Sequence, residues 1–506
     1  MPTVQSIISK GYFPVELPPY FNTEVYGNFL AANASALPSS FRDDKLISKS
    51  ATHNLARRGT LRRELRIPNP INYYMLASFV VDNWTILERH ASQSPFSLTT
   101  PVDAAYDRAI GRRCDFNERP KHMTRIRSTS RYILQTDINR FYHSIYTHCI
   151  PWAICGKSAA KANRSPDLLG NKLDMLVRNA QDGQTLGIPV GPDTSLLVAE
   201  IILSAADVVL SNKGITNGFR YMDDYEFGFP NYAEAEQSLG TLQEVLNTYE
   251  LALNPKKTQI TNLPKPTEAF SISELRTFIF RSTQVAQHSD ILRYFDRAFS
   301  FFEENPEDEI LQYAVSRLMG ETIHQDNWTL CENLLLQCAI VEPGAIRFVL
   351  KQFLKYKELS YLLNFDRIGE TFNRVITQHA PLGHSSEVAW AIWGLLAMNI
   401  SMQANSASAA SSMNDSVVAI LVLDANSKNL IPSGTDFGNY QSLMTTDDLY
   451  GEHWLVAYEA NAKGWLPSVG QKDHVNTDER FSILKANGVS FYDDSRALYI
   501  AQVEGY

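Results

Sequence analysis

The sequence has little cysteine and no long apolar run. Its five cysteines, an odd number, never occur as CxxC, which argues against a disulfide framework and against a cysteine-based structural zinc site. No uninterrupted apolar stretch approaches the roughly 20 residues that cross a bilayer. The segment MPTVQSIISKGYF also does not show the charged-then-apolar pattern of a signal peptide. We therefore expect a cytoplasmic protein with reduced thiols and no membrane partner.

The composition has no strong bias of any kind. Hydrophobic residues make up 44% and charged residues 20% of the 506 positions, which is ordinary for a globular protein. A chain of this length exceeds one compact core, so we expect two domains.

The charge is unevenly distributed along the chain. The whole sequence carries a net charge of −9, but residues 1–131 carry about +7. The basic residues of this part lie in two runs, which are Arg57, Arg58, Arg62, Arg63 and Arg66, and Arg108, Arg112, Arg113, Arg119, Lys121, Arg125, Arg127 and Arg131. Such runs form either a phosphate-binding surface or a merely solvated face, and charge alone favours neither.

From residue 131 the sequence alternates short strands with helices. The pattern predicts a strand that ends at Asp137, a helix over 141–145, and a long apolar helix that begins after GIPVGPD with Asp193 and Thr194 as caps. Two strands then fold about the acidic turn in GFRYMDDYEFGF, and a helix over 232–249 and a strand after LALNPKKTQI follow. This order predicts an α+β fold, in which helices back a small antiparallel sheet.

After about residue 285 helical periodicity replaces the strand signals. Apolar residues recur at spacings of three and four, and proline and glycine separate short helices. We predict domains over 1–285 and 286–506, the second built from helical repeats. The Ala, Ser and Asn-rich stretch 403–414 is the best candidate for an internal linker or exposed loop.

Three aspartates are the strongest candidates for chemistry. Phosphoryl transfer from a nucleoside triphosphate uses two divalent cations, and Mg²⁺ prefers carboxylate ligands. Asp137 at a strand end, with Asp223 and Asp224 at the tip of a hairpin, would supply them if the two elements are neighbours. The acidic doublet alone is weak evidence, because such pairs in turns are usually only solvated.

Five segments between residues 60 and 262 carry a family resemblance. In chain order they are RELRIPNP, TDINRFYHSI, GIPVGPDTS, RYMDDYEF and LALNPKKT. RYMDDYEF resembles the reverse-transcriptase signature of an aromatic residue, any residue and two aspartates. The others resemble, in the order of that family, its fingers segment, motif A, motif B and motif D. The resemblance implies a fingers-and-palm polymerase with two Mg²⁺ ions, or Mn²⁺ as the alternative.

The resemblance also implies roles for individual residues. Metal ligation falls to Asp137, Asp223 and Asp224 with Ile138 beside them, and general acid catalysis falls to Lys257 rather than Lys256. Nucleotide binding falls to Arg63, to the motif B residues Gly187, Pro189 and Gly191, and to Tyr142. Tyr142 lies five residues after Asp137, where the family has an aromatic gate that selects deoxyribonucleotides. The chain departs from the family at Val190, where many members have glutamine.

Three further segments narrow the resemblance. KGYFPVELPPYFNT, HSSEVAWAIW and EHWLVAYEAN resemble the abortive-infection, AbiK-like class of bacterial reverse transcriptases, which act in phage defence. That class implies a HEAT-like helical domain after the polymerase and a homo-oligomer, either a trimer or a hexamer. Trp390 and Trp393 of the second segment are expected to be core residues.

Three functions remain open at this point. The leading one is a DNA polymerase of phage defence that uses deoxynucleoside triphosphates, works without a template or on a non-coding RNA, and makes single-stranded DNA. The rivals are a conventional retroelement reverse transcriptase and a degenerate polymerase that serves as a scaffold. No thumb, RNase H, endonuclease or maturase segment is recognisable after residue 262, which disfavours the retroelement enzyme.

The class resemblance also implies priming on the protein itself. Its members attach the DNA product covalently to a tyrosine. Such a residue needs a mobile segment, which favours the ends of the chain. The candidates are Tyr12, Tyr20, Tyr26, Tyr492, Tyr499 and Tyr506.

Overall fold

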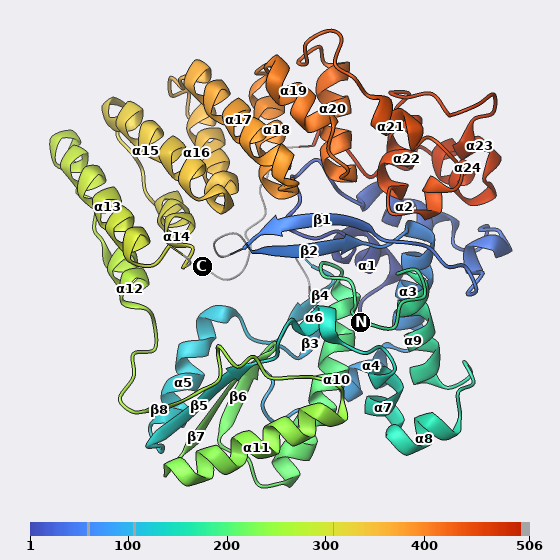
Figure 1. Cartoon of the computed structure of the whole chain (residues 1–506), viewed down its shortest axis with the longest axis vertical. Helices are drawn as coiled ribbons and strands as arrows, with labels where there is room; N and C mark the ends of the chain where they lie inside the picture. The colour runs from blue at the N-terminus through green and yellow to red at the C-terminus, as the bar shows by residue number, and fades with distance from the viewer. Residues whose placement is uncertain (58–60, 105–107, 307, 497–506) are drawn as a thin grey trace.

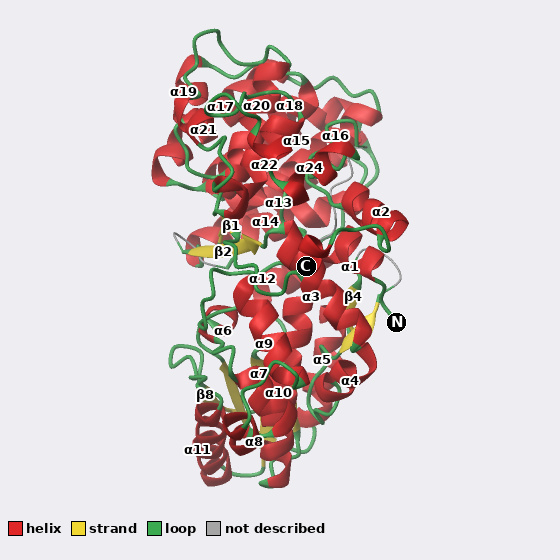
Figure 2. Ribbon diagram, turned by 90° about the vertical axis from the view of Figure 1, so that its right-hand side faces the viewer, coloured by secondary structure: helices red, strands yellow, loops and turns green. Residues whose placement is uncertain are grey.

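The computed structural model describes residues 1–57, 61–104, 108–306 and 308–496. The chain forms a lower part that contains the main sheet and an upper arc of helices (Figures 1 and 2). Arg58 of the first basic run and the tyrosines Tyr499 and Tyr506 lie outside the described residues.

The N-terminal part supplies helices and two small hairpins. Its elements are α1 (Val4–Gly11), α2 (Glu24–Asn33), β1 (Ala51–Ala56), β2 (Arg62–Ile67), α3 (Pro70–Asp82), α4 (Trp84–Ala91), β3 (Pro101–Asp103), β4 (Ile110–Arg112) and α5 (Arg119–Arg127). Strands β1 and β2 pair antiparallel, as do β3 and β4.

The main sheet has four antiparallel strands in the order β6-β7-β5-β8. The strands are β5 (Tyr132–Asp137), β6 (Gly218–Tyr221), β7 (Asp224–Phe229) and β8 (Gln259–Asn262), and the helices between them are α6 (Phe141–Ser144), α7 (Cys149–Cys155), α8 (Lys157–Ala162), α9 (Leu169–Asn179), α10 (Asp193–Asn212) and α11 (Tyr232–Thr248). The predicted α+β fold with a small antiparallel sheet is confirmed.

Helices cover both faces of this sheet. Leu134 and Phe227 belong to the large core that contains residues of α10 and α11. Ile133 and Phe219 pack instead with Met123 and Ile126 of α5, in a second cluster. The alternation of Ile133 and Leu134 follows from the two-residue period of a strand.

Helix α10 is long and apolar enough to cross a membrane, but 78% of its apolar window is buried inside the protein, as in a core helix.

The described residues of the C-terminal part form helices joined by loops. It contains α12 (Phe270–Thr277), α13 (Gln284–Glu304), α14 (Ile310–Arg317), α15 (Trp328–Val341), α16 (Ile346–Glu358), α17 (Phe365–His379), α18 (Ser385–Met398), α19 (Ala404–Ser411), α20 (Ser416–Ser427), α21 (Gly438–Ser442), α22 (Trp454–Ala462), α23 (His474–Thr477) and α24 (Glu479–Ala486). These helices form the arc in Figure 1, which bears out the predicted helical region. The proposed division at 285/286 falls in the first turn of α13.

Two local predictions were wrong. The stretch 403–414 is not a linker, because residues 404–411 form α19, which buries Ser406, Ala407 and Ala410. Its small side chains allow close packing between α17 and α20, and Asn373 of α17 accepts hydrogen bonds from the Gln403 amide and the Ser406 hydroxyl. Asp193 and Thr194 do not cap α10, since the cap position is Pro192.

The hairpin β1–β2 joins the two parts of the molecule. It lies beneath α18 and α20 in Figure 1. His53 of β1 is buried against Asp415, with Nδ1 3.0 Å from Oδ2. Trp454 of α22 donates from Nε1 to the Ile67 carbonyl at 3.0 Å. Trp390 and Trp393 are 5% and 0% exposed, which confirms that they are core residues.

Candidate active site

The register of the main sheet brings the predicted carboxylates together. Asp137 ends β5 and pairs directly with Asp224, the first residue of β7. Residues directly opposite in an antiparallel pair project from the same face, so Asp137 and Asp224 share a face of the sheet. Asp223 lies in the turn between β6 and β7, where its carbonyl accepts a hydrogen bond from the Ile138 amide at 3.3 Å.

The negative charge of this cluster is only partly compensated. Lys257 pairs with Oδ2 of Asp137, and Arg119 lies 3.5 Å from Oδ2 of Asp224. Oδ1 of Asp137 is buried and accepts no hydrogen bond from the described residues. Burial raises the pKa of Asp223 to about 6, with further contributions from the charges of Asp224 and Asp137.

These observations test whether the cluster fits metal ions. A buried carboxylate oxygen without a donor and a carboxyl with a raised pKa both indicate a place for positive charge, and carboxylate oxygens are the donors that Mg²⁺ prefers. The three carboxylates are not drawn into a compact ligand group among the described residues. Metal ions would therefore compete with Lys257 and Arg119 for them.

The loop before β8 places Lys257 beside Asp137. The amide of Asn254 donates to the Asp137 carbonyl at 2.9 Å, and the amide of Lys257 donates to the Asn254 carbonyl at 3.1 Å. The hydroxyls of Thr258 and Thr136 lie 2.7 Å apart. The structure thus brings Lys257, rather than Lys256, to the cluster.

The motif B turn packs against α6, which carries Tyr142. The amide of Ile188 donates to the Tyr142 carbonyl at 2.9 Å, and Gly187 donates to Ile145 at 2.8 Å. Gly187 has φ +84°, and a Cβ there would lie 3.3 Å from the His143 carbonyl oxygen. Gly191 has φ +130°, and a Cβ there would come within 2.5 Å of Pro14.

Both glycines are thus required by packing within the chain itself, and a contact with template remains a prediction. Pro189, between them, is buried. Val190 receives the Arg66 amide on its carbonyl at 3.0 Å, which attaches β2 to the turn.

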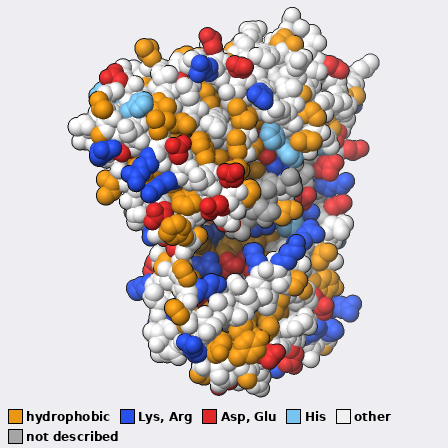
Figure 3. Space-filling view, turned by 60° about the vertical axis from the view of Figure 1, so that its left-hand side comes forward, with side chains coloured by type: hydrophobic (Ala, Val, Ile, Leu, Met, Phe, Trp, Pro, Cys, Tyr) orange, Lys and Arg blue, Asp and Glu red, His pale blue; other side chains and the backbone are white. Residues whose placement is uncertain are grey.

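Tyr142 lies within the electrostatic reach of the cluster. Burial raises the pKa of its phenol well above the usual range; the charges of Arg112 and Arg63 oppose this rise, and the charge of Asp223 adds to it. Arg63 lies on β2. A hollow separates the helical arc from the part with the main sheet, and basic and acidic side chains line it (Figure 3).

Several arginines of the basic runs are engaged within the protein. Arg62 pairs with Glu387 of α18, Arg66 with Glu64, Arg108 with Asp193, Arg119 with Asp224 and Arg127 with Glu226. For Arg62, Arg108 and Arg127 these partners are buried carboxylates, so at these positions the arginines are held by ion pairs within the protein. The partners Glu387, Asp193 and Glu226 lie far along the chain from these arginines, so the basic runs by themselves do not reveal the ion pairs.

The four described priming candidates are core residues. Tyr12 donates to the Pro68 carbonyl, Tyr26 to the Pro70 carbonyl at 2.9 Å, and Tyr492 to Oδ2 of Asp424 at 2.7 Å. Tyr20 packs edge-on against Trp393 and Tyr492. The expectation of mobile segments was wrong for these four, because the two ends of the described chain pack against each other through the Phe21 and Tyr492 bridge.

Sequence reasoning missed a buried arginine that supports the turn. Arg220 of β6 is 0% exposed and pairs with Glu200 and Asp207 of α10, at 2.9 and 2.8 Å. Its Nη1 also donates to the Met222 carbonyl at 2.7 Å, while the Met222 amide donates to Thr99 at 3.1 Å. These bonds hold Met222 at φ +56°, just before Asp223. The sequence around Arg220 gives no local signal of its burial, because both carboxylate partners lie on α10.

Removal of this arginine should destabilise the fold strongly. Arg220→Met leaves the buried carboxylates of Glu200 and Asp207 without their cation, which typically costs about 3–5 kcal/mol. We expect that loss in urea unfolding monitored by circular dichroism. Arg125→Met, at an exposed position of α5, is the matched control and should change stability by less than about 0.5 kcal/mol. Equal stability of the two variants would contradict the assigned role.

The raised pKa of Asp223 predicts a pH-dependent stability of the metal-free protein. The folded state keeps a proton between about pH 4 and pH 6 that the unfolded state releases, so stability falls as pH rises through this window. Above pH 6 the charged carboxylate costs about 3 kcal/mol. In EDTA, Asp223→Asn should therefore be more stable than wild type at pH 8, and the difference should shrink toward pH 4. Urea unfolding at both pH values measures it, and equal stabilities at pH 8 would refute it.

Comparison with known proteins agrees with this site. Residues 86–296 match the family model described as reverse transcriptase (RNA-dependent DNA polymerase). The match contains Asp137, Tyr142, the motif B turn, Asp223, Asp224 and Lys257, and it does not contain Arg63. This match, over less than half of the chain, supports an enzyme of the nucleotidyltransferase class. A search of curated proteins finds no match.

Proposed function

We propose that this protein is a DNA polymerase that extends a strand by two-metal phosphoryl transfer at Asp137, Asp223 and Asp224. The observation that carries the proposal is the pairing of Asp137 with Asp224, beside Asp223, within the region that matches the reverse transcriptase family. The burial and the like charges that raise the pKa of Asp223 support it, since functional sites concentrate such shifts.

Each residue near the cluster has a role in this proposal. The three aspartates, with Ile138 beside them, would hold two Mg²⁺ ions, which activate a 3′-hydroxyl and neutralise the leaving pyrophosphate when bound. Lys257 holds its ammonium group at Asp137, from which a proton can be donated to the leaving group. Tyr142 packs against the sugar and excludes a 2′-hydroxyl, and Arg63 contacts the triphosphate.

A scaffold that has lost activity fits these observations less well. Uncompensated burial of like charges is costly, and a binding module has no electrostatic reason to keep it. A conventional retroelement enzyme would need additional nucleic-acid-binding or nuclease segments. The described chain after β8 offers helices instead.

We further propose a role in cytoplasmic phage defence. This part rests on the three segments that resemble the abortive-infection class, of which HSSEVAWAIW contributes the core tryptophans of α18. The same resemblance implies that the chain forms a trimer or hexamer and that it binds a non-coding RNA. Size-exclusion chromatography with light scattering, and sequencing of co-purified nucleic acid, test these two points.

Whether synthesis needs an RNA template is tested by incubation of the purified protein with Mg²⁺ and labelled deoxynucleotides, with and without a primed RNA. Incorporation in both reactions indicates untemplated synthesis, and incorporation only with RNA indicates reverse transcription. Absence of DNase-sensitive label in both reactions would refute the proposed polymerase.

Priming on the protein predicts DNA attached to a tyrosine. Because four candidates are held in the core, we expect loss of attachment in Tyr499→Phe or Tyr506→Phe and not in Tyr26→Phe, which serves as the control. Denaturing electrophoresis of protein labelled with radioactive deoxynucleotide, with and without nuclease, measures attachment. Label that runs only as free DNA after boiling in detergent would show that an external primer is used.

A further inference from the structure

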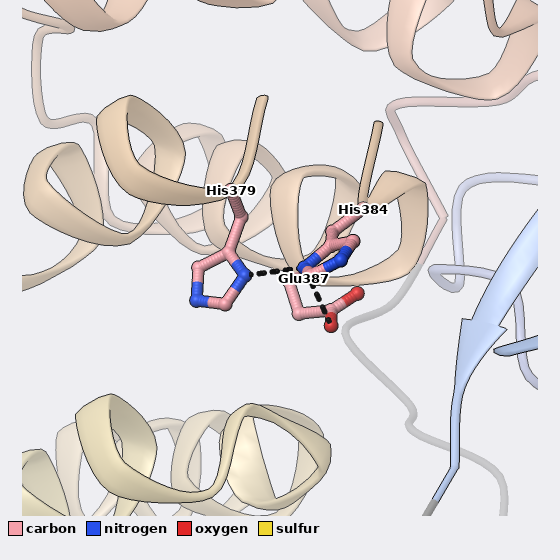
Figure 4. Close-up of side chains that lie close together, drawn as sticks. All are labelled: His379, His384 and Glu387. Carbon is pink, nitrogen blue, oxygen red and sulfur yellow. Dashed lines mark hydrogen bonds and ion pairs between the residues drawn. The ribbon is translucent and has the colours of Figure 1, made fainter. Parts of the chain in front are cut away.

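Two histidines and a glutamate converge where α17 meets α18 (Figure 4). His379 ends α17, His384 precedes α18, and Glu387 lies in its first turn. Nδ1 of His379 is 2.9 Å from Nδ1 of His384, which is 3.8 Å from Oε1 of Glu387. Within the described part of the chain, this is the one group of three such side chains whose ligand atoms all lie within 4.8 Å of one another.

We propose that His379, His384 and Glu387 form a site for a divalent transition metal, with Zn²⁺ as the best match. Two imidazole nitrogens and one carboxylate oxygen are a ligand set that Zn²⁺ takes, with the fourth tetrahedral position left to water. Neutral imidazole favours a transition metal over Mg²⁺ or Ca²⁺, which prefer oxygen ligands. The site is distinct from the aspartate cluster and does not rest on the proposed polymerase activity.

The protonation state of the pair suits a metal. Two ring nitrogens 2.9 Å apart cannot both carry a proton at their meeting point, so at least one Nδ1 presents a lone pair to the other. Burial lowers the pKa of both imidazoles, and the charge of Arg62 lowers the pKa of His384 further. Neutral rings are the form that a metal binds.

The surroundings of the ligands resemble the outer shell of a metal site. Arg62 of β2 donates to both carboxylate oxygens of Glu387. Oε2 also accepts from the Ser386 hydroxyl at 2.7 Å, so Oε1, the oxygen nearest His384, is the one that keeps a lone-pair site for a metal. Asn54 of β1 accepts from the Ser385 amide at 3.1 Å and donates to the Gly383 carbonyl, which fixes the loop between the two histidines.

The position of the site suggests what the metal would do. The contacts of Arg62 and Asn54 attach the ligand-bearing loop to the hairpin β1–β2. Arg63, which follows Arg62 in β2, is proposed to contact the triphosphate. A bound ion would fix the loop against this hairpin. Zn²⁺ should therefore stabilise the junction between the helical arc and the hairpin.

The test is a zinc titration of protein stripped with EDTA and dialysed, in competition with a chromophoric chelator. We expect one Zn²⁺ per chain, at least a tenfold weaker affinity in His379→Ala/His384→Ala, and unchanged affinity in His288→Ala, whose histidine is exposed on α13. The variant Asp137→Asn/Asp223→Asn should keep the same zinc, which separates this site from the aspartates. Equal affinity in wild type and the double histidine variant would overturn the proposal, as would loss of zinc in the aspartate variant alone.

A second measurement guards against misfolded variants. Zn²⁺ in excess should raise the melting temperature of wild type by about 2 °C or more and leave that of His384→Gln unchanged, while the metal-free proteins melt alike. If the histidine variants do not fold, visible absorption of Co²⁺-loaded wild type decides. A four-coordinate spectrum supports the site, and the spectrum of aqueous Co²⁺ overturns it.

Discussion

Asp137→Asn and Asp223→Asn should each abolish nucleotide incorporation. Each substitution keeps the shape of the side chain and removes a charge that metal ions need, and the loss of metal-based stabilisation of several kcal/mol lowers the rate by at least roughly 10³-fold. The measurement is acid-insoluble label formed from radioactive deoxynucleotides under Mg²⁺. The substitutions should not impair folding, because asparagine has the shape of aspartate and Asp223→Asn removes a charge that burial disfavours.

The matched control is Glu236→Gln, which removes one negative charge from the exposed surface of α11. This variant should incorporate nucleotides at the wild-type rate. Circular dichroism should show the same helix content in all three variants. Near wild-type incorporation in either aspartate variant would remove that residue from the active site.

Tyr142→Ala should admit ribonucleotides. A ring packed against C2′ of the sugar leaves no room for a 2′-hydroxyl, so its removal should lower the preference for deoxynucleotides by about 10²-fold. The preference is measured as the ratio of kcat/KM values for dCTP and CTP. Tyr142 is suited to this role by its position between the motif B turn and the aspartates.

Tyr142→Phe is the control for this prediction, because it keeps the ring and removes only the hydroxyl. It should retain the wild-type preference. If Tyr142→Ala also retains that preference, the selectivity for deoxynucleotides arises elsewhere and Tyr142 is only a packing residue.

The main sheet and its carboxylates could be predicted because their signals are local. The alternation of β5, the acidic turn before β7 and the loop that carries Lys257 each extend over about ten residues of sequence. The pairing of Asp137 with Asp224 then follows from the antiparallel order of the strands. Even the preference for Lys257 over Lys256 depended on its immediate neighbours.

The remaining features depend on partners far away in the sequence. Arg62 pairs with Glu387 across 325 residues, and nothing in the basic run of the fingers segment predicts that partner. Asn373 bonds Ser406 and Gln403, and these contacts turn a stretch of linker-like composition into a packed helix. Tyr492 is fixed by Asp424, although its place near the end of the chain suggested mobility. Periodicity and composition do not contain such tertiary contacts.

The central claim is that the three aspartates bind the metal ions of nucleotidyl transfer, and binding of Mn²⁺ in the presence of dCTP tests it most directly. Electron paramagnetic resonance of free Mn²⁺, titrated with protein, gives the number of bound ions. We expect two nucleotide-dependent ions per wild-type chain and their loss in Asp137→Asn/Asp223→Asn, with His379→Ala/His384→Ala unchanged. The same number of nucleotide-dependent ions in wild type and in the aspartate variant would contradict the claim.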